Sequence, residues 1–311
     1  MNYIPDKRGS ATILIMLIAA VLMTVGLGFN WLVKEHIRSS EGLKNKAEAI
    51  IKARSTYDDI IFLILSGRLL PKEVALTSGE DIIGKNTLPL NGQEIALADD
   101  ISVRIQESNG VLPVWKLDYI DKNALQRVIE RQSKDPENAS VRAESLMDWI
   151  DEDKLSRVNG AEESYYQGRA LPYVPRNYAL QSLEEIKLVR GFDEDLFEKL
   201  QTQITLLPAT GFNPNTASDE VLMAQLNIDD NALKTLKEYM SVKAVSSDRE
   251  LFALTGRRIV RDEESINFLP SPFMDITINV GKPRNIYTIR AGLLILQKTY
   301  APYSILSWKE E

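Results

Sequence analysis

The hydrophobic pattern of the chain opens with one unbroken apolar run near the N-terminus. No charged residue occurs between Gly9 and Val33, and the stretch ATILIMLIAAVLMTVGLGFNWLV within it is almost entirely apolar. In helical form, about 20 apolar residues cross the hydrocarbon core of a bilayer. Because Lys7 and Arg8 precede the run, we expect a single membrane-spanning helix with its N-terminus in the cytoplasm.

The apolar run continues without a proline into an amphipathic segment. The apolar positions of this second segment recur at helical spacing: Ala47, Ile50, Ile51, Tyr57, Ile60, Ile61, Leu63, Ile64 and Leu65. The pattern predicts one long helix from about Thr12 to Gly67, with its first half in lipid and its second half amphipathic. A generic single-pass anchor followed by a separate short helix fits the same pattern.

Short strand-like runs follow the helix and return at the end of the chain. The early runs include IALA, ISVRIQ and VWKLDYI, and the Asn-Gly pairs at 91–92 and 109–110 predict hairpin turns. The late runs are FMDITINVG, IYTIRAGLLILQKTYA and YSILSW. Alternation of Ile276, Ile278 and Val280 indicates a half-buried strand. We expect these runs to form one small antiparallel sheet.

The region between the early and late strands, residues 121–269, has a helical and more polar pattern. It holds 27 acidic and 19 basic residues, a net charge of −8, whereas the whole chain carries −7. The predicted fold class is therefore α+β. A long N-terminal helix packs on a small antiparallel sheet, and a large all-helical insertion separates the early strands from the late ones.

Composition and motifs argue against most enzymatic functions. The chain has no cysteine, which excludes thiolate catalysis, iron–sulfur clusters and disulfides. Its single histidine, His36, adjoins the apolar run, and no P-loop, GxSxG, HExxH or dinucleotide motif occurs. We predict that the protein is not an enzyme. A membrane-anchored hydrolase would need a converging carboxylate pair, which the sequence does not single out.

The N-terminal segment MNYIPDKRG is short, basic at its end, and finishes in Gly9 directly before the apolar run. It resembles a type IV prepilin leader, which a dedicated prepilin peptidase cuts on the cytoplasmic side after the glycine. The resemblance implies cleavage between Gly9 and Ser10, with Ser10 as the methylated mature N-terminus. Most pilins carry Glu at the fifth mature position, but here that position is Leu14. A buried carboxylate without a partner is costly, so its absence suits a subunit at a filament tip.

An ordered series of motifs lies in the predicted insertion: DWIDED, NGAE followed by a tyrosine, YVPRN, SLEE, VRGFD and NPNTASDEVL. Together with the leader, this series resembles the minor pseudopilin of the K type, general secretion pathway protein K of the type II secretion system. The resemblance covers the chain from Gly9 to about Leu226. It implies a pilin-like α/β domain with a helical insertion, placed at the tip of the periplasmic pseudopilus, and a structural role in protein secretion across the outer membrane.

The resemblance also implies partners, location and divisions of the chain. The expected partners are the I-, J- and H-type minor pseudopilins in a tip complex, with the prepilin peptidase as processing enzyme and no nucleic acid. The protein would be a single-pass inner-membrane protein with its C-terminal bulk in the periplasm. The expected divisions are the leader (1–9), the transmembrane part of the helix (10–33), the pilin-like helix and first strands (34–120), the helical insertion (121–269) and the C-terminal strands (270–311).

Acidic residues crowd into one loop of the predicted insertion. Asp148, Asp151 and Asp153 place three carboxylates within six residues, and Asn159 and Glu162 follow. Calcium takes six to eight oxygen ligands from loops of this kind, and such carboxylates repel one another without a cation. We predict that these five residues bind calcium, as the resemblance to K-type pseudopilins also implies, with the number of ions left open. In the alternative interpretation, Asp148 caps a helix or faces solvent on it, and the other residues form an exposed acidic loop.

The segment NPNTASDEVL predicts a helix start. Asn215, Thr216 and Ser218 offer capping oxygens, and the acidic pair at 219–220 suits a helix N-terminus. The alternative is a helix-hairpin-helix module, as in a membrane-tethered DNA-binding protein of a competence-type pilus. The following NIDDNALKTL, however, has two aspartates where phosphate would lie. We expect the segment to share only the fold element with such modules.

Overall fold

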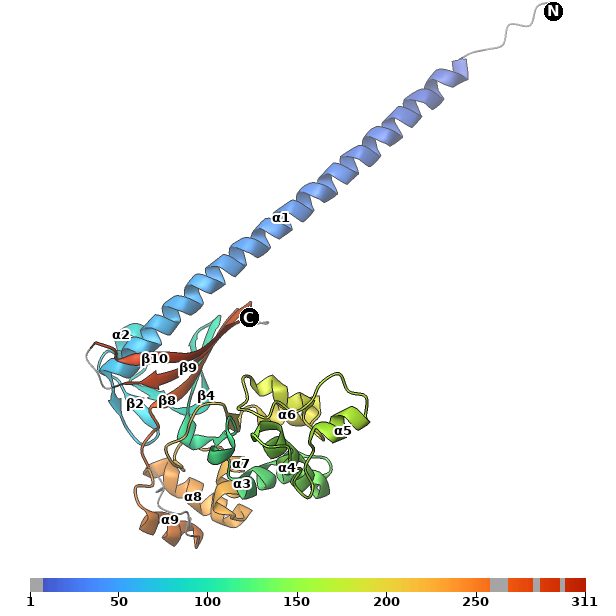
Figure 1. Ribbon diagram of the computed structural model, residues 1–311. Coiled ribbons are helices and arrows are strands. Elements are labelled where there is room, and N and C mark those ends of the chain that lie inside the picture. The colour runs from blue at the N-terminus through green and yellow to red at the C-terminus, as the bar shows by residue number, and fades with distance from the viewer. Residues whose placement is uncertain (1–7, 258–267, 282–285, 297–299) are drawn as a thin grey trace, which may run out of the picture. The chain divides into compact units, whose positions relative to one another are not determined.

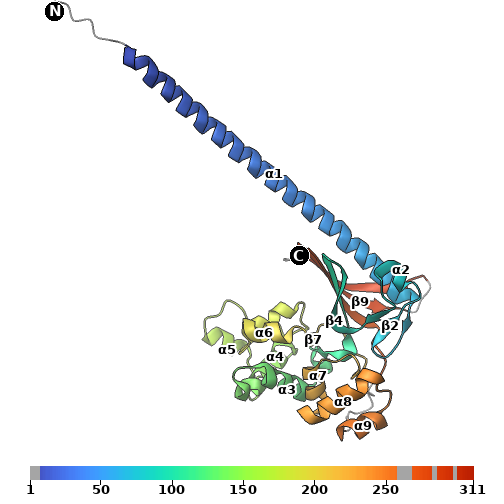
Figure 2. The same ribbon diagram turned by 180° about the vertical axis from the view of Figure 1, so that it is seen from behind.

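The computed structural model describes residues 8–257, 268–281, 286–296 and 300–311, without the side chains of residues 8–10. It divides into two units, Met1–Lys52 and Ala53–Glu311. The helix α1, Arg8–Ser66, runs through both of them (Figures 1 and 2). The prediction of one continuous N-terminal helix is confirmed.

The described residues of the first unit are the N-terminal part of α1. Its apolar side chains lie in solvent; Ile13, Leu22 and Phe29, for example, are exposed. Helix α1 is long and apolar enough to cross a membrane, and it is the only such helix in the part of the chain that the structure describes. Because a soluble protein buries its apolar residues, this surface is compatible with a single-pass anchor.

The last turns of α1 belong to the second unit and form part of its core. Tyr57, Ile60, Ile61 and Ile64 are buried, and their spacing gives the helix one apolar face. The Tyr57 ring meets the ring of Trp308, in the last strand, edge to face with centroids 4.9 Å apart. This face of the helix therefore packs against the sheet, as predicted.

The main sheet has five antiparallel strands in the order β10-β9-β8-β5-β4. Its strands are β4 (Asn91–Ala98), β5 (Ile101–Glu107), β8 (Phe273–Val280), β9 (Tyr287–Ile295) and β10 (Tyr303–Glu310). β5 pairs with β8 along its whole length, from Ile101 opposite Val280 to Glu107 opposite Met274. Early and late strands thus share one sheet, as the alternating patterns predicted. A smaller sheet in the order β1-β2-β3 consists of Arg68–Leu69, Glu73–Ala75 and Thr87–Pro89, and the short helix α2, Gly79–Ile83, lies between β2 and β3 in sequence.

Both predicted Asn-Gly hairpin turns are wrong. The pair at 91–92 begins β4, and the hairpin between β4 and β5 turns at residues 99–100 instead. Gly92 has a φ of 70°, and the β4–β5 register shifts between Asn91 and Glu94. The glycine therefore accommodates an irregularity in an edge strand. The pair at 109–110 belongs to the 3-10 turn η1, Ser108–Gly110, where the chain leaves the sheet.

The run VWKLDYI is also not a strand. Its centre forms the 3-10 turn η2, Leu117–Tyr119. Trp115 lies against Tyr119, with ring centroids 5.0 Å apart, and the amide of Leu180 donates a hydrogen bond to the Trp115 carbonyl. The β-branched and aromatic residues of this run predicted a strand that pairs in a sheet. Instead, its aromatic rings pack on each other and its backbone accepts a hydrogen bond from a loop.

Between β5 and β8 the chain forms the helical insertion. Its helices are α3 (Lys122–Gln132), α4 (Ala139–Ile150), α5 (Glu163–Gly168), α6 (Glu194–Leu200), α7 (Asp219–Leu226), α8 (Asp230–Val242) and α9 (Asp248–Thr255), with the 3-10 turns η3 (Pro136–Asn138) and η4 (Leu183–Leu188). The expectation of an all-helical insertion needs one correction. The insertion also contains the short strand β7, Ile204–Thr205, which pairs in parallel with β6, Leu112–Pro113. The amides of Leu112 and Val114 donate to the carbonyls of Gln203 and Thr205, each at 2.9 Å.

Side-chain caps fix where several of these helices begin. Five of them start after an Asp or Ser whose side chain accepts a hydrogen bond from an amide of the first turn. These caps are Asp121, Asp193, Ser218, Asp229 and Ser247.

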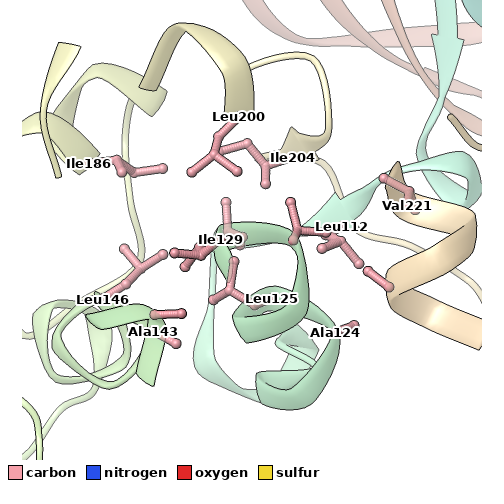
Figure 3. Close-up of a cluster of buried hydrophobic side chains, with 14 of the residues drawn as sticks. Leu112, Ala124, Leu125, Ile129, Ala143, Leu146, Ile186, Leu200, Ile204 and Val221 are labelled. Carbon is pink, nitrogen blue, oxygen red and sulfur yellow. The ribbon is translucent and has the colours of Figure 1, made fainter. Parts of the chain in front are cut away.

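The core of the insertion surrounds α3, which packs against α4, α6 and α7. Figure 3 shows Leu125 and Ile129 of α3 facing side chains from the other elements. Leu146 of α4 and Leu200 of α6 are among the fully buried residues. Since burying a large aliphatic side chain contributes about 1.5–3 kcal/mol, this apolar cluster holds helices together that are far apart in sequence.

Candidate functional site

The acidic loop predicted from the sequence connects α4 with α5. Asp148 lies in the last turn of α4, Asp151 is the C-cap of α4, and Glu162 is the N-cap of α5. Their exposed fractions are 0%, 5% and 4%. The alternative of a solvated acidic loop therefore does not hold for these three residues.

Arg157, within the same loop, is the cation of this cluster. Its Nη1 donates to Oδ1 of Asp148 at 2.5 Å and also to Oδ2 of Asp151. The backbone amide of Arg157 donates to Oδ2 of Asp148 at 3.1 Å. Both oxygens of Asp148 thus have donors inside the loop, and one guanidinium bridges two carboxylates.

Two buried carboxylate oxygens in the cluster have no hydrogen-bond donor among the described residues: Oδ1 of Asp151 and Oε1 of Glu162. The other oxygen of Glu162 accepts the backbone amide of Glu163 at 3.3 Å, and the side chain of Asn177 also interacts with this carboxylate. Burial raises the pKa of Asp151, and the charges of Asp153 and Asp148 add to the rise. Burial likewise raises the pKa of Glu162, with Asp151 and Asp148 adding to it. An unsatisfied buried acceptor costs about 1–3 kcal/mol, and carboxylate oxygens are the ligand type that hard cations such as calcium take.

The two other predicted ligands lie differently. The Asp153 side chain is exposed, and its Oδ1 accepts the amide of Leu155 at 2.7 Å. Asn159 is half-buried, and its backbone N–H donates to Oε2 of Glu144 at 2.8 Å. Across the ranges that the structure describes, no three Asp, Glu or His side chains converge closely enough to hold a metal ion. The oxygen ligands that calcium prefers are thus present in the loop, but Arg157 draws two of the carboxylates together.

The sequence analysis assigned no role to Arg157 or to Gly160, although both shape this loop. A Cβ atom on Gly160 would lie 1.9 Å from Oδ2 of Asp148, so the loop can approach the carboxylate only with glycine there. The Gly160 carbonyl also accepts Nη1 of Arg190 at 3.0 Å. Two basic residues, Lys154 and Arg157, lie in this otherwise acidic stretch and were the available signal for a bridging cation.

A second polar centre lies where the insertion joins the sheet, and the sequence did not predict it. Glu107, the last residue of β5, is fully buried. Its Oε2 accepts the amides of Asn109 and Ser271, each at 2.8 Å. Its Oε1 accepts Nδ2 of Asn213 at 3.2 Å and the hydroxyl of Thr216. The carboxylate thus joins the outgoing chain, the returning chain and the NPNT segment.

This arrangement corrects the predicted capping roles in NPNTASDEVL. Only Ser218 caps α7, accepting the amide of Val221 at 3.3 Å. Asn215 instead exchanges two hydrogen bonds with the backbone of Val245, at 2.8 and 2.9 Å. Thr216 donates to Glu107. Asn215 thus bonds to another part of the insertion and Thr216 to a strand of the main sheet, and neither side chain caps α7.

The segment considered as a helix-hairpin-helix module forms the consecutive helices α7 and α8. Asn227, with a φ of 49°, ends α7, and Asp229 caps α8 by accepting the amide of Ala232 at 2.9 Å. The Asp229 carboxylate therefore takes the amide that a DNA phosphate would use in a binding module of this type. This geometry gives the DNA-binding alternative no support.

The predicted processing site lies at the start of α1. Residues 1–7 are outside the described part of the chain. The backbones of Gly9 and Ser10 are in the first turns of α1, and their side chains are not described. Leader cleavage and methylation of Ser10 stay predictions.

Taken together, an apolar N-terminal helix whose end packs on an antiparallel sheet defines an α+β protein of the pilin-like class, enlarged by a helical insertion between β5 and β8. Residues 103–209 match the family model for type II secretion system (T2SS), protein K. The recognition made from the ordered motifs is thereby confirmed: the chain resembles K-type proteins of this secretion system.

Individual relatives agree with the family model. The chain is 22% identical over 228 residues to type II secretion system protein K of Pectobacterium carotovorum subsp. carotovorum, which covers 68% of this chain and 67% of that protein. It is 29% identical over 101 residues to the protein K of Klebsiella pneumoniae, covering 32% of this chain and 28% of that protein. The similarity thus spans two thirds of the first relative and less than a third of the second.

A solved structure shares the fold. It is the crystal structure of the GspK-GspI-GspJ complex from the type 2 secretion system of enterotoxigenic Escherichia coli, matched with a TM-score of 0.53. The match covers 90% of this chain and 99% of that chain, at 18% sequence identity. It supports the predicted α+β architecture over nearly the whole chain.

Proposed function

We propose that the protein is a minor pseudopilin at the tip of a type II secretion pseudopilus, with a structural role in protein secretion across the outer membrane. The observation that carries this proposal is the combination of an apolar pilin-like helix with a large insertion between β5 and β8. The helix would bundle with those of neighbouring subunits. The described residues of the insertion form seven α-helices, and a domain of this size beside the sheet would block further subunits above it.

The proposed position explains Leu14. In a filament, a carboxylate at this position neutralises the terminal amine of the neighbouring subunit. A subunit at the tip has no neighbour ahead of it, and an unpaired carboxylate in an apolar environment would be costly. We further propose removal of residues 1–9 by a prepilin peptidase, methylation of Ser10, and a periplasmic location for the folded part.

The partners in this proposal are the other minor pseudopilins. The solved relative is a complex of K, I and J proteins. We propose that this chain assembles with the I- and J-type subunits of its own system, and with the H-type subunit below them. Assembly requires binding surfaces but no reaction, so the proposal assigns the chain no catalytic role.

Secretion in the native host tests the proposed function. Deleting the gene should abolish release of the system's exoproteins into the medium, and the intact gene should restore it. A chain lacking residues 121–269, joined by a short linker and checked for membrane insertion, should fail to restore it. Normal exoprotein release from the deletion strain would refute the proposal.

We also propose calcium as a ligand of the acidic loop. Support comes from Asp151 and Glu162, each of which has a buried oxygen without a hydrogen-bond donor among the described residues. Asp148, Asp153 and Asn159 are the further oxygen donors of the loop. When bound, calcium supplies a divalent charge that relieves the repulsion among these carboxylates.

Thermal unfolding of the full chain in detergent, measured with calcium and with a chelator, tests this assignment. At a calcium concentration 100 times the dissociation constant, the folded form should gain about 2.7 kcal/mol, and a chelator should remove the gain. Asp151→Asn should abolish the calcium effect, whereas Asp118→Asn, at an exposed side chain in η2, should leave it intact. Equal unfolding temperatures with calcium and with chelator would exclude the site.

A further inference from the structure

Strand β10 forms one edge of the five-stranded sheet. β9 pairs with its inner side, and no strand in the described ranges pairs with its outer side. An edge strand presents a row of unpaired N–H and C=O groups to any extended chain that approaches it. Figure 1 shows β10 at the border of the sheet, beside β9.

The side chains of β10 do not protect this edge. Residues 303–308 include no charged residue and no proline. Ile305 and Leu306 are each 48% exposed and Trp308 is 39% exposed. The opposite edge, β4, differs because it carries the exposed Glu94 and two shifts of register, which are features that discourage pairing. β10 has a single shift, at Leu306.

The backbone geometry shows which groups of β10 point outward. Thr288 and Glu311 exchange two backbone hydrogen bonds of 3.0 Å, and the amide of Leu296 donates to the carbonyl of Pro302 at 2.7 Å. Inward and outward positions alternate along an antiparallel strand. Counting from Pro302, the N–H and C=O of Ile305 point away from β9. The outer side of β10 therefore offers free backbone groups next to an exposed apolar side chain.

The charged residues at the end of β10 are already paired within the chain. Nζ of Lys309 lies 2.9 Å from Oε1 of Glu184, and Nη2 of Arg54 lies 3.1 Å from Oε1 of Glu310. These charged side chains thus have partners within the chain, and they lie beyond the apolar part of the strand. A partner of this edge would therefore be recognised by backbone pairing and apolar contact, and not by charge.

We propose that the outer edge of β10 binds an extended, apolar strand of a partner pilin-like subunit, which continues the main sheet by one strand. This inference rests on the proposed function, because it assigns the contact surface for a neighbouring subunit at the tip. Strand addition gives affinity through main-chain hydrogen bonds and specificity through alternate side chains. Ile305 and Leu306 supply the apolar contact of that strand.

The test uses the full chain and full-length I- and J-type subunits of the same system, all in detergent. Ile305→Pro removes one outward N–H while the inward bonds of β10 to β9 stay, which an edge strand tolerates. Ile305→Thr is the matched control, because it keeps the N–H and the β propensity. We expect Ile305→Pro to weaken binding by at least about tenfold and Ile305→Thr by about threefold or less. Unfolding temperatures of both variants would show that they remain folded.

Hydrogen exchange on the wild-type proteins gives an independent measurement. Amides of residues 303–308 should exchange more slowly in the complex than in the free chain, whereas those of β4 should not change. If the complex forms with unchanged exchange in β10, or if Ile305→Pro binds like the wild type, the inference is wrong while the proposed function stands. Self-association through β10 without binding to either subunit would also overturn it. If the wild type binds neither subunit and does not self-associate, both the inference and the proposed function fail.

Discussion

Replacing Glu107 by Gln should change stability in a way that depends strongly on pH. The buried carboxylate accepts two backbone amides on one oxygen, and Asn213 and Thr216 donate to the other. The backbone amides cannot reverse, so the Gln carbonyl must face them and its NH2 must face Asn213. Because Oδ1 of Asn213 is occupied by Asn215, at 3.1 Å, this amide cannot turn to accept. In the variant, the NH2 group of the Gln side chain therefore faces the Nδ2 donor of Asn213 without an acceptor between them, which costs about 1–3 kcal/mol.

The pH dependence follows from the ionisation of Glu107. Burial raises its pKa from 4.5 to about 7, although all four neighbours donate to it. A folded pKa above the unfolded one means that the folded state binds the proton more tightly. The contribution of protonated Glu107 to the free energy of unfolding is therefore fully present below pH 4.5 and is lost as the pH rises through 7. The loss amounts to about 3 kcal/mol, and Gln is free of it.

The assay is denaturant unfolding of the full chain in detergent at pH 5 and pH 8. At pH 5, Glu107→Gln should be less stable than the wild type by about 1–3 kcal/mol. At pH 8, the variant should be as stable as the wild type or more stable. The wild type then carries the cost of a buried ionised carboxylate, which offsets the cost of the unfavourable donor contact in the variant. Glu94→Gln, at an exposed position of β4, should stay within about 0.5 kcal/mol at both values. A destabilisation by Glu107→Gln that is the same at pH 5 and pH 8 would refute this reasoning.

Three further predictions concern the acidic loop and the N-terminus. Arg157→Met should destabilise the chain by about 3–5 kcal/mol because it leaves buried carboxylates unpaired, and calcium should restore much of the loss in thermal unfolding experiments. Gly160→Ala should cost about 1–3 kcal/mol because its Cβ meets a carboxylate at 1.9 Å, whereas Gly168→Ala, with open space around it, should be nearly neutral by the same measurement. Intact mass of the protein from native membranes should match a chain that begins at Ser10, with or without one methyl group, and the mass of the full chain would contradict leader processing.

The elements that the sequence predicted well are those with a strong periodic pattern. The helix near 12–67 and the alternation at Ile276, Ile278 and Val280 each report burial on one face, which backbone periodicity alone determines. The Asn-Gly pairs misled because a glycine with positive φ suits both a hairpin turn and a bulged edge strand. The choice at 91–92 depended on which strand β4 would pair with, and that is a long-range property.

The acidic loop was only partly predictable for a related reason. Clustered carboxylates in the sequence correctly indicated a site of mutual repulsion, and three of them are buried there. Their spacing does not indicate that Arg157 bridges Asp148 and Asp151, since that contact depends on how the loop turns back. Nor does it indicate that Asp153 remains exposed. Contacts set by loop conformation leave little periodic signal in a sequence.

The hydrogen bonds between the sheet and the insertion also leave little signal in the sequence. They explain how the insertion keeps its orientation on the sheet. Glu107 on β5 and Asp275 on β8 each accept a hydroxyl from a threonine of the insertion, Thr216 and Thr205 respectively. Desolvation raises the pKa of Asp275 to about 6, so both acceptors are costly to ionise. Such groups are tolerated where their hydrogen bonds select one arrangement over others. Because neighbouring strands of the sheet supply both acceptors, the insertion is bonded to β5 and to β8, and rotation about a single connection would break hydrogen bonds at the other.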